Sequence, residues 1–234
     1  MIGGATRLVG LIGDPVAGSL SPRMQNAAFA ARGLDWAYVP LPVAAERLPD
    51  AIRGLVALGL AGANVTAPHK EAVAPLCDEV AEESVNTLVI RDGVVHGSNT
   101  DREIVAGLTP SRVCLIGAGG AAKALLGALG GSVRLFSRRG DWPPDATECD
   151  LIVNATPVRD ELLVTPRRDQ AVVDLAYSAD GSETALVRAA RAAGCDVVID
   201  GLEALVRQGA ASFERWTGVP APIDVMRAAV RSAG

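Results

Sequence analysis

A glycine-rich turn between two apolar segments constrains the fold of this chain more than any other feature. The turn, Gly117-Ala118-Gly119-Gly120, follows the apolar run Val113–Ile116 and precedes a segment rich in Ala and Leu. A strand, a glycine turn and a helix in this order are typical of dinucleotide-binding sites. Gly117 would allow the sharp turn, and Gly119 would let the backbone approach a pyrophosphate at the helix N-terminus. An ordinary tight strand-to-helix connection has the same pattern.

Composition limits the classes of partner. The net charge is −5 and no Lys/Arg-rich run occurs, so nucleic acid and anionic membranes are not expected as partners, whereas a small anionic ligand is compatible. No apolar run is long enough to span a bilayer, and the N-terminus has no leader pattern. The four cysteines are far apart and form no metal-type pair. We therefore expect reduced cysteines, no metal site and a cytoplasmic protein.

The first hundred residues alternate between strand and helix patterns. Apolar segments predict strands, and Asp92-Gly93 between two of them predicts a hairpin. Pro40 and Pro42 predict either an edge position for their strand or an early end to its pairing. The expected strands are 7–12, 37–43, 62–66, 84–90 and 94–97, and the expected helices are 21–31, 45–58, 71–82 and 101–108. These elements predict an N-terminal α/β domain with a mixed sheet.

Several polar residues in this half are candidates for ligand binding, each with a structural alternative. Ser19 and Ser21 could hold a carboxylate at a helix N-terminus, or Ser21 could simply cap that helix. Pro68 opens the next predicted helix, so Lys70 would project from its first turn toward a substrate oxygen or into solvent. Asp101 could be a helix N-cap.

The second half predicts a shortened parallel sheet. The strand 132–136 is followed by Ser137-Arg138-Arg139, and arginines at this place favour the 2′-phosphate of NADP, although Asp141 is close and the arginines could face solvent. Only the eleven residues 140–150 precede the next strand, 151–154, too few for a crossover helix and a further strand. We expect 132–136 to be the edge strand. The remaining expected elements are strands 172–175 and 196–199 and helices 183–193, 202–216 and 222–233.

Taken together, the motifs resemble those of the shikimate dehydrogenase family over nearly the whole chain. No single motif is decisive, but their number and order are specific. They are Gly13-Asp14-Pro15, Ser19-x-Ser21-Pro22, Gly62-Ala63-Asn64-Val65-Thr66 with Pro68 and Lys70, Val85-Asn86-Thr87, Asn99-Thr100-Asp101, Gly117-x-Gly119-Gly120-Ala121, Asn154-Ala155-Thr156, Asp174 with Tyr177, and Asp200-Gly201-Leu202 with Gln208.

The resemblance implies a two-domain enzyme that interconverts 3-dehydroshikimate and shikimate with NADP(H), on the pathway to chorismate and aromatic amino acids. Residues 1–101 and 202–234 would form the substrate-binding and catalytic domain, and residues 102–201 a Rossmann-like dinucleotide-binding domain. The enzyme would be a monomer or a homodimer.

The resemblance also implies the roles of individual residues. Lys70 and Asp101 would be the catalytic pair. The substrate would be bound by Ser19, Ser21, Thr66, Asn86, Asp101, Tyr177 and Gln208. The cofactor would be bound by Gly117, Ala118, Gly119, Gly120, Ala121, Ser137, Arg138, Arg139, Asn154, Ala155 and Thr156.

Three departures from the family pattern leave alternatives open. Arg102 stands where the family usually has Gly, the segment before Val85 is short, and the adenine side of the cofactor site is truncated. They suggest a divergent member that acts on quinate or on an aminated shikimate analogue. A dehydrogenase for folate-bound one-carbon units and a non-catalytic ligand sensor on the same scaffold are further alternatives.

Overall fold

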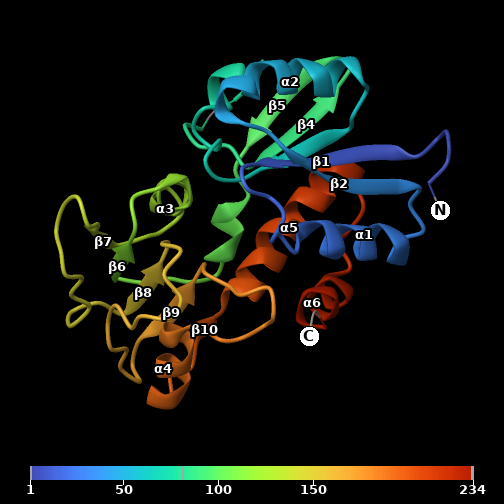
Figure 1. The fold of residues 1–234 in the computed structure, drawn as a ribbon. Coiled ribbons are helices and arrows are strands. Elements are labelled where there is room, and N and C mark those ends of the chain that lie inside the picture. Colours follow the sequence, from blue (N-terminus) through green and yellow to red (C-terminus); the bar gives the residue numbers. More distant parts are fainter. Residues whose placement is uncertain (1, 81, 233–234) are drawn as a thin grey trace. The chain divides into compact units, whose positions relative to one another are not determined.

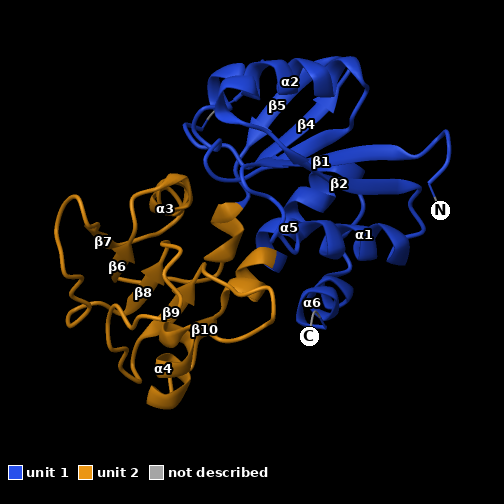
Figure 2. Ribbon diagram, in the orientation of Figure 1, with its two compact units in different colours: residues 1–100, 206–232 blue, residues 101–205, 233–234 orange. Residues whose placement is uncertain are grey.

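The computed structural model describes residues 2–80 and 82–232. These residues form two separate five-stranded sheets with their connecting helices and loops. Each sheet belongs to its own compact unit (Figure 2). One unit comprises residues 1–100 and 206–232, and the other comprises residues 101–205. The boundary falls directly before Asp101 and again within helix α5 (Gly201–Thr217). The functions that we expect for the two domains stay predictions.

The first sheet is mixed and has the strand order β2-β1-β3-β4-β5 (Figure 1). Its first three strands are parallel, and β4 and β5 form an antiparallel hairpin. The hairpin turn has positive φ at Asp92 (52°) and Gly93 (82°), as a tight two-residue hairpin turn requires. The strands are β1 (Arg7–Gly13), β2 (Trp36–Pro42), β3 (Gly62–Val65), β4 (Thr87–Arg91) and β5 (Val94–Ser98). The predicted hairpin and the edge position of β2 are confirmed.

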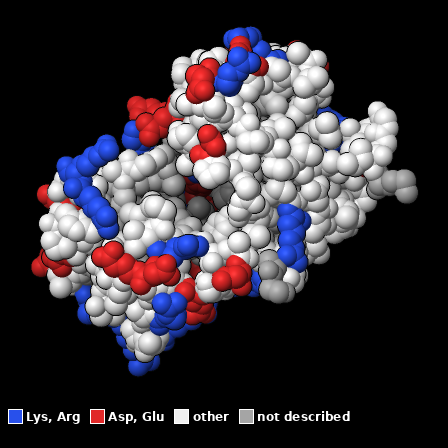
Figure 3. All heavy atoms as spheres, viewed as in Figure 1, with Lys and Arg blue, Asp and Glu red and all other residues white. Residues whose placement is uncertain are grey.

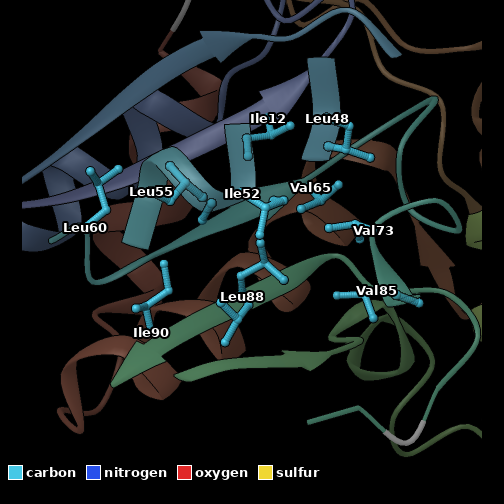
Figure 4. Close-up of a cluster of buried hydrophobic side chains, with 13 residues drawn as sticks. Ile12, Leu48, Ile52, Leu55, Leu60, Val65, Val73, Val85, Leu88 and Ile90 are labelled. Atoms are coloured by element: carbon cyan, nitrogen blue, oxygen red, sulfur yellow. The ribbon is translucent and has the colours of Figure 1, made fainter. Parts of the chain in front are cut away.

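Helices cover both faces of this sheet. On one face, α2 (Leu48–Ala57) follows the short 3-10 helix η1 (Ala45–Arg47) and packs its apolar stripe on the strands (Figure 4). The other face is covered by α1 (Ser21–Ala31) and α5, and α6 (Ile223–Arg231) packs against α1 (Figure 1). There Phe29 of α1 stacks on Phe213 of α5, with ring centroids 5.3 Å apart. The aromatic contact fixes α5 on the first unit.

The second sheet is entirely parallel, with the strand order β10-β9-β8-β6-β7. Its strands are β6 (Arg112–Ile116), β7 (Ser132–Phe136), β8 (Leu151–Asn154), β9 (Ala171–Asp174) and β10 (Val198–Ile199). Two helices of this unit are α3 (Gly120–Leu126) and α4 (Ala185–Ala193). Residues 137–150 cross from β7 to β8 without a helix or a strand. This confirms the truncated sheet with β7 at its edge.

Three local predictions were wrong. Residues 71–82 do not form a helix: Pro75 lies in the 3-10 helix η2 (Ala74–Leu76), and the amides of Asp78 and Glu79 then donate to Val95 of β5 instead (residue 81 lies outside the described residues). The predicted helix 101–108 is only the 3-10 helix η3 (Asp101–Ile104). Leu20, not Ser21, is the N-cap of α1, and no side chain caps it. The predicted final helix reaches residue 233, which also lies outside the described residues.

Basic and acidic side chains are interspersed on the face shown in Figure 3. No helix within the described residues is long and apolar enough to cross a membrane. All four cysteines are free thiols, and burial raises the pKa of Cys77 to about 11 and that of Cys114 to about 12. Burial therefore disfavours the thiolate form of both residues.

Candidate functional site

Strand register brings the three stretches that we predicted to bind a cofactor to one edge of the second sheet. Ile116 of β6 is opposite both Phe136 of β7 and Asn154 of β8. The next residues along the chain, Gly117 and Ala155, therefore emerge together at the carboxyl ends of the strands, as does Ser137. Their amides complete the edge, since Gly117 donates to the Phe136 carbonyl (2.8 Å) and Ala155 donates to the Ile116 carbonyl (2.7 Å).

The two glycines of the turn meet different demands. Gly117 has φ +118°, and a Cβ there would lie 2.9 Å from the carbonyl carbon and oxygen of Ala155, so only glycine fits. Gly119 is the N-cap of α3 with φ −83°, and a Cβ there would meet no atom within 4 Å. The protein itself therefore does not require glycine at position 119, and the open space beside it would admit a ligand.

A buried carboxylate organises the ends of β8 and β9. The Asn154 side chain donates to Asp174 Oδ1 (2.9 Å) and accepts from the Thr156 amide (3.0 Å) and hydroxyl (2.7 Å). Asp174 also accepts from the Ala176 amide (3.0 Å) and from Thr184 Oγ1 (2.5 Å). Burial raises the pKa of Asp174, although these hydrogen bonds act in the opposite direction. Asp174 thus fixes both the Asn154–Thr156 turn and the segment that leads into Tyr177, a role that sequence reasoning missed.

The arginines after β7 lie on the exposed edge of the second sheet. Arg138 and Arg139 are both exposed. The Arg138 guanidinium lies 3.6 Å from Glu161 Oε2 and 5.5 Å from the ring centroid of Trp142. The Ser137 amide donates to the Asp141 carbonyl (3.1 Å), which closes the turn that carries the arginines. Two cations are therefore presented beside the strand ends.

In the first unit, three of the predicted substrate residues follow the carboxyl ends of β1 and β3, namely Ser19, Ser21 and Thr66. The Thr66 amide donates to the Ile12 carbonyl (2.8 Å), and the Asp14 amide donates to the Ala67 carbonyl (3.2 Å), so the loops after the two strands are joined. The loop after β1 leads to half-buried Ser19, whose Oγ accepts from the amide of buried Ser21 (3.2 Å). Lys70 lies in a turn, not at the start of a helix as we predicted.

Asn86 and Lys70 are tied to the same strand ends. The Lys70 carbonyl accepts from the Val85 amide (2.7 Å). Asn86 follows Val85 in the chain, and its carbonyl accepts from the Val65 amide (2.8 Å). The Asn86 side chain is 2 % exposed and accepts from the Thr100 amide (2.8 Å). Hydrogen bonds and short stretches of chain therefore connect four residues, namely Thr66, Lys70, Asn86 and Thr100.

Helix α5 brings Gln208 to this cluster. Ser212, one turn later, donates to the Gln208 carbonyl (3.1 Å) and lies within hydrogen-bond distance of Thr87 (2.8 Å) and Thr100 (3.2 Å). Gly209 packs closely on α1, and Gln25 of α1 donates to its carbonyl (2.9 Å). The backbone of Gln208 is thus held against the residues that flank Asn86.

The remaining predicted residues belong to the second unit. Asp101 is covalently joined to Thr100, begins η3 and is 4 % exposed. Tyr177 is half-buried and follows β9, and Arg102 is exposed. The convergence of Lys70 with Asp101 involves both units and stays a prediction. Within the described residues, no group of three or more His, Cys, Asp or Glu side chains could hold a metal ion.

The two edges suit different parts of a reaction. The first unit presents hydroxyls, amides and one ammonium group, which together suit a small polyhydroxylated acid. The second presents an open glycine turn and two arginines, which suit a phosphorylated dinucleotide.

Comparisons with known proteins agree along the whole chain. A family model described as the shikimate dehydrogenase substrate binding domain matches residues 11–88, and one described as the shikimate 5′-dehydrogenase C-terminal domain matches residues 201–231. The chain is 42% identical to the shikimate dehydrogenase (NADP(+)) of Anaeromyxobacter dehalogenans, with 97% of each chain covered. It is 41% identical to that of Rubrobacter xylanophilus, with 100% of this chain and 98% of the other covered.

A solved structure gives the same result for the fold. The chain resembles the crystal structure of shikimate 5-dehydrogenase from Thermus thermophilus in complex with NADP(H) and shikimate, with a TM-score of 0.87 and 30% identity, covering 98% of this chain and all of the other. The alignment with the Anaeromyxobacter relative extends over 276 positions, more than the 234 residues of this chain. This chain therefore lacks residues that the relative has.

Proposed function

The chain belongs to the shikimate dehydrogenase family, and we propose that it is an NADP-dependent enzyme that interconverts 3-dehydroshikimate and shikimate. The observation that carries this proposal is identity above 40% to curated NADP-dependent shikimate dehydrogenases across essentially the whole chain. The shared strand edge of the second unit and the polar cluster of the first unit support it independently.

The second unit fits the dinucleotide. The open space at Gly119 would take the pyrophosphate, and Gly117, Ala118, Gly120 and Ala121 would line it. Ser137, Arg138 and Arg139 would hold the 2′-phosphate, because a guanidinium binds phosphate oxygens in a bidentate manner. Asn154, Ala155 and Thr156 would flank the nicotinamide, which supplies or accepts the hydride when the cofactor is bound. Asp174 keeps that turn in place.

Most of the residues that we propose to bind the substrate belong to the first unit. The Ser19 and Ser21 hydroxyls would bind the carboxylate, and Thr66, Asn86, Asp101 and Gln208 would bind the ring hydroxyls. Tyr177 would line the same site. These side chains supply both donors and acceptors, as a ligand with one carboxylate and several hydroxyls requires.

Lys70 and Asp101 would perform the acid–base chemistry. In the reduction of the ketone, negative charge develops on the carbonyl oxygen, and the Lys70 ammonium would stabilise that charge and donate the proton. Asp101 would orient the ammonium and accept a hydrogen bond from a ring hydroxyl. Of the 22 basic residues only Lys70 and Lys123 are lysines, so an ammonium at position 70 is not a default cation of this chain. A guanidinium in its place could hold charge but could not release a proton.

The test is an assay of the purified enzyme for NADPH formation. Shikimate, quinate, an aminated shikimate analogue and a no-substrate control are each combined with NADP⁺ or NAD⁺. The proposal predicts the highest kcat/KM for shikimate with NADP⁺. A preference for quinate would move the chain toward its 27% identical neighbour, the quinate dehydrogenase of Corynebacterium glutamicum. Binding of shikimate without turnover of any substrate would indicate a ligand sensor and contradict the proposal.

Other expectations belong to this proposal as well. From the cysteine usage and the mixed charge we also propose a cytoplasmic enzyme without nucleic acid or membrane partners. A monomeric or homodimeric state is a further expectation, which composition does not determine. Size-exclusion chromatography with light scattering would measure the oligomeric state directly.

A further inference from the structure

The oxygen and nitrogen ends of the Asn86 side-chain amide can be told apart because one of its partners is a backbone N–H, which donates and cannot accept. The backbone amide of Thr100 lies 2.8 Å from one end of the Asn86 carboxamide, so that end must be the oxygen, Oδ1. The hydroxyls of Thr87 (2.8 Å) and Thr100 (3.1 Å) also lie against this oxygen. Three donors therefore converge on Oδ1, and the amide nitrogen occupies the opposite end of the planar group.

A second layer of buried groups orients the two hydroxyls. The Asn64 amide nitrogen donates to the backbone carbonyl of Asn86 (3.0 Å), which can only accept, and it also lies 3.2 Å from Thr87 Oγ1 and 3.0 Å from Ser212 Oγ. The Asn64 oxygen in turn accepts from the Tyr38 hydroxyl (2.9 Å). All these side chains are less than a tenth exposed. Because water cannot replace their partners, each hydrogen bond in the cluster restricts the next one.

We propose that Thr87 and Thr100 are positioning residues that fix Asn86 as a hydrogen-bond donor toward the substrate. This inference rests on the proposed function, in which Asn86 contacts a ring hydroxyl. With Oδ1 held by three protein donors, the contact uses an N–H of Asn86, and the substrate atom must be an acceptor. A hydroxyl oxygen satisfies this requirement, whereas a protonated amine at the same ring position does not, because an ammonium has no lone pair. The cluster thereby selects hydroxylated over aminated substrates at that position.

The test compares isosteric and conservative variants of Thr100 in the full-length enzyme. Thr100→Val removes the hydroxyl but keeps the shape and the backbone amide, and Thr100→Ser restores the hydroxyl. We expect Thr100→Val to raise the KM for shikimate by about 3–10-fold, the range for one lost hydrogen bond, while the KM for NADP⁺ changes less than about twofold. Thr100→Ser should return the KM for shikimate to near the wild-type value, and Thr87→Val should behave like Thr100→Val.

Thr217→Val is the matched control, since it removes a threonine hydroxyl from the same unit, one that donates to the Phe213 carbonyl. It should leave both KM values unchanged. If Thr100→Val matches Thr217→Val, or if it raises both KM values equally and Thr100→Ser gives no rescue, the positioning role is overturned while the enzyme remains a shikimate dehydrogenase. A wild-type enzyme that oxidises no shikimate would instead overturn the proposed function, and this inference with it.

A second measurement tests the direction of the Asn86 amide. Asn86→Asp keeps an oxygen for the three protein donors but replaces the N–H donors with a second acceptor. We expect the protein to fold and to bind NADP⁺ as the wild type does, with a KM for shikimate raised at least about tenfold. An Asn86→Asp enzyme with an unchanged KM for shikimate would show that Asn86 does not donate to the substrate.

Discussion

Gly117 and Gly119 are two residues apart, yet the structure requires glycine only at the first. Gly117 combines a left-handed φ with contact against Ala155, whereas Gly119 has an ordinary φ and open space around it. A requirement for glycine at position 119 would therefore have to come from a ligand. This distinction separates a cofactor-binding turn from an ordinary tight turn, the alternative that the sequence pattern left open.

Alanine substitutions test this distinction. Gly119→Ala should leave the free energy of unfolding within about 0.5 kcal/mol of the wild type, yet it should raise the Kd for NADP⁺ at least about tenfold, because the added methyl group occupies the pyrophosphate space. Gly117→Ala should lower stability by about 1–3 kcal/mol because of its backbone conformation and contacts. Denaturant unfolding and calorimetric titration measure the two quantities. Unaltered NADP⁺ binding by Gly119→Ala would argue for the ordinary turn.

Asp174 should give the second unit a distinctive dependence on pH. Because burial raises its pKa in the folded protein, the native state holds a proton that the unfolded chain releases above the ordinary value of 3.8. The stabilising contribution is complete below that value and is lost as the pH rises through the raised pKa. The difference in unfolding free energy between the wild type and Asp174→Asn should therefore fall with rising pH in this window.

Denaturant unfolding of both proteins across the acidic range measures this difference. Asp169→Asn is the control of opposite sign, since the hydrogen bond from Arg167 lowers the pKa of Asp169. Its contribution should be present above the ordinary value and should be lost as the pH falls through the lowered pKa. A wild-type minus Asp174→Asn difference that rises with pH would show that hydrogen bonding outweighs burial at Asp174.

Among single residues, strand ends were predictable and side-chain partners were not. Gly117, Ser137 and Asn154 could be placed because each follows an apolar run whose length sets the strand end. The hydrogen bonds to the Asn86 side chain and those around Asp174 join residues from separate strands and loops. Which residues meet there depends on the strand register, which the sequence does not state. A polar residue at the end of an apolar strand, as Asp174 is, was the available signal.

At the scale of elements, chain length predicted more than local propensity did. Counting residues between Arg139 and Leu151 was enough to predict that no crossover helix fits and that β7 is an edge strand, which the strand order confirms. The helical pattern of residues 71–82 failed because Asp78 and Glu79 bond to β5, a contact between segments that propensity does not describe. The shortened edge leaves Leu135 of β7 40% exposed.

Helix α5 should contribute strongly to the stability of the first unit. Phe213 is fully buried and stacks on Phe29 of α1, so Phe213→Ala should lower the free energy of unfolding by about 3–5 kcal/mol. Leu58→Ala is the control, because Leu58 is 79% exposed and its loss should change stability by less than about 0.5 kcal/mol. Urea unfolding measures both. Equal effects of the two variants would contradict the packing of α5 described above.

The predicted binding residues are divided between the two units of the molecule. The residues that we propose to bind the cofactor lie in the second unit, and most of those that we propose to bind the substrate lie in the first. Asp101 and Tyr177 are the exceptions, since both belong to the second unit. The alternation of strands and helices was enough to predict two α/β units and both sheet types. Which side chains of one unit face the other cannot be derived from periodicity, so the catalytic pair rests on the family resemblance.

The turnover number of Lys70 variants with shikimate and NADP⁺ shows whether Lys70 donates the proton and stabilises the developing charge. Lys70→Ala should lower kcat by about 10²–10⁴-fold with little change in the affinity for NADP⁺. Lys70→Arg should also be impaired, because a guanidinium keeps the charge but cannot transfer the proton. Lys123→Ala, a substitution of the chain's other lysine, should retain the wild-type kcat. A Lys70→Ala enzyme that turns over near the wild-type rate would show that Lys70 neither donates the proton nor stabilises the charge.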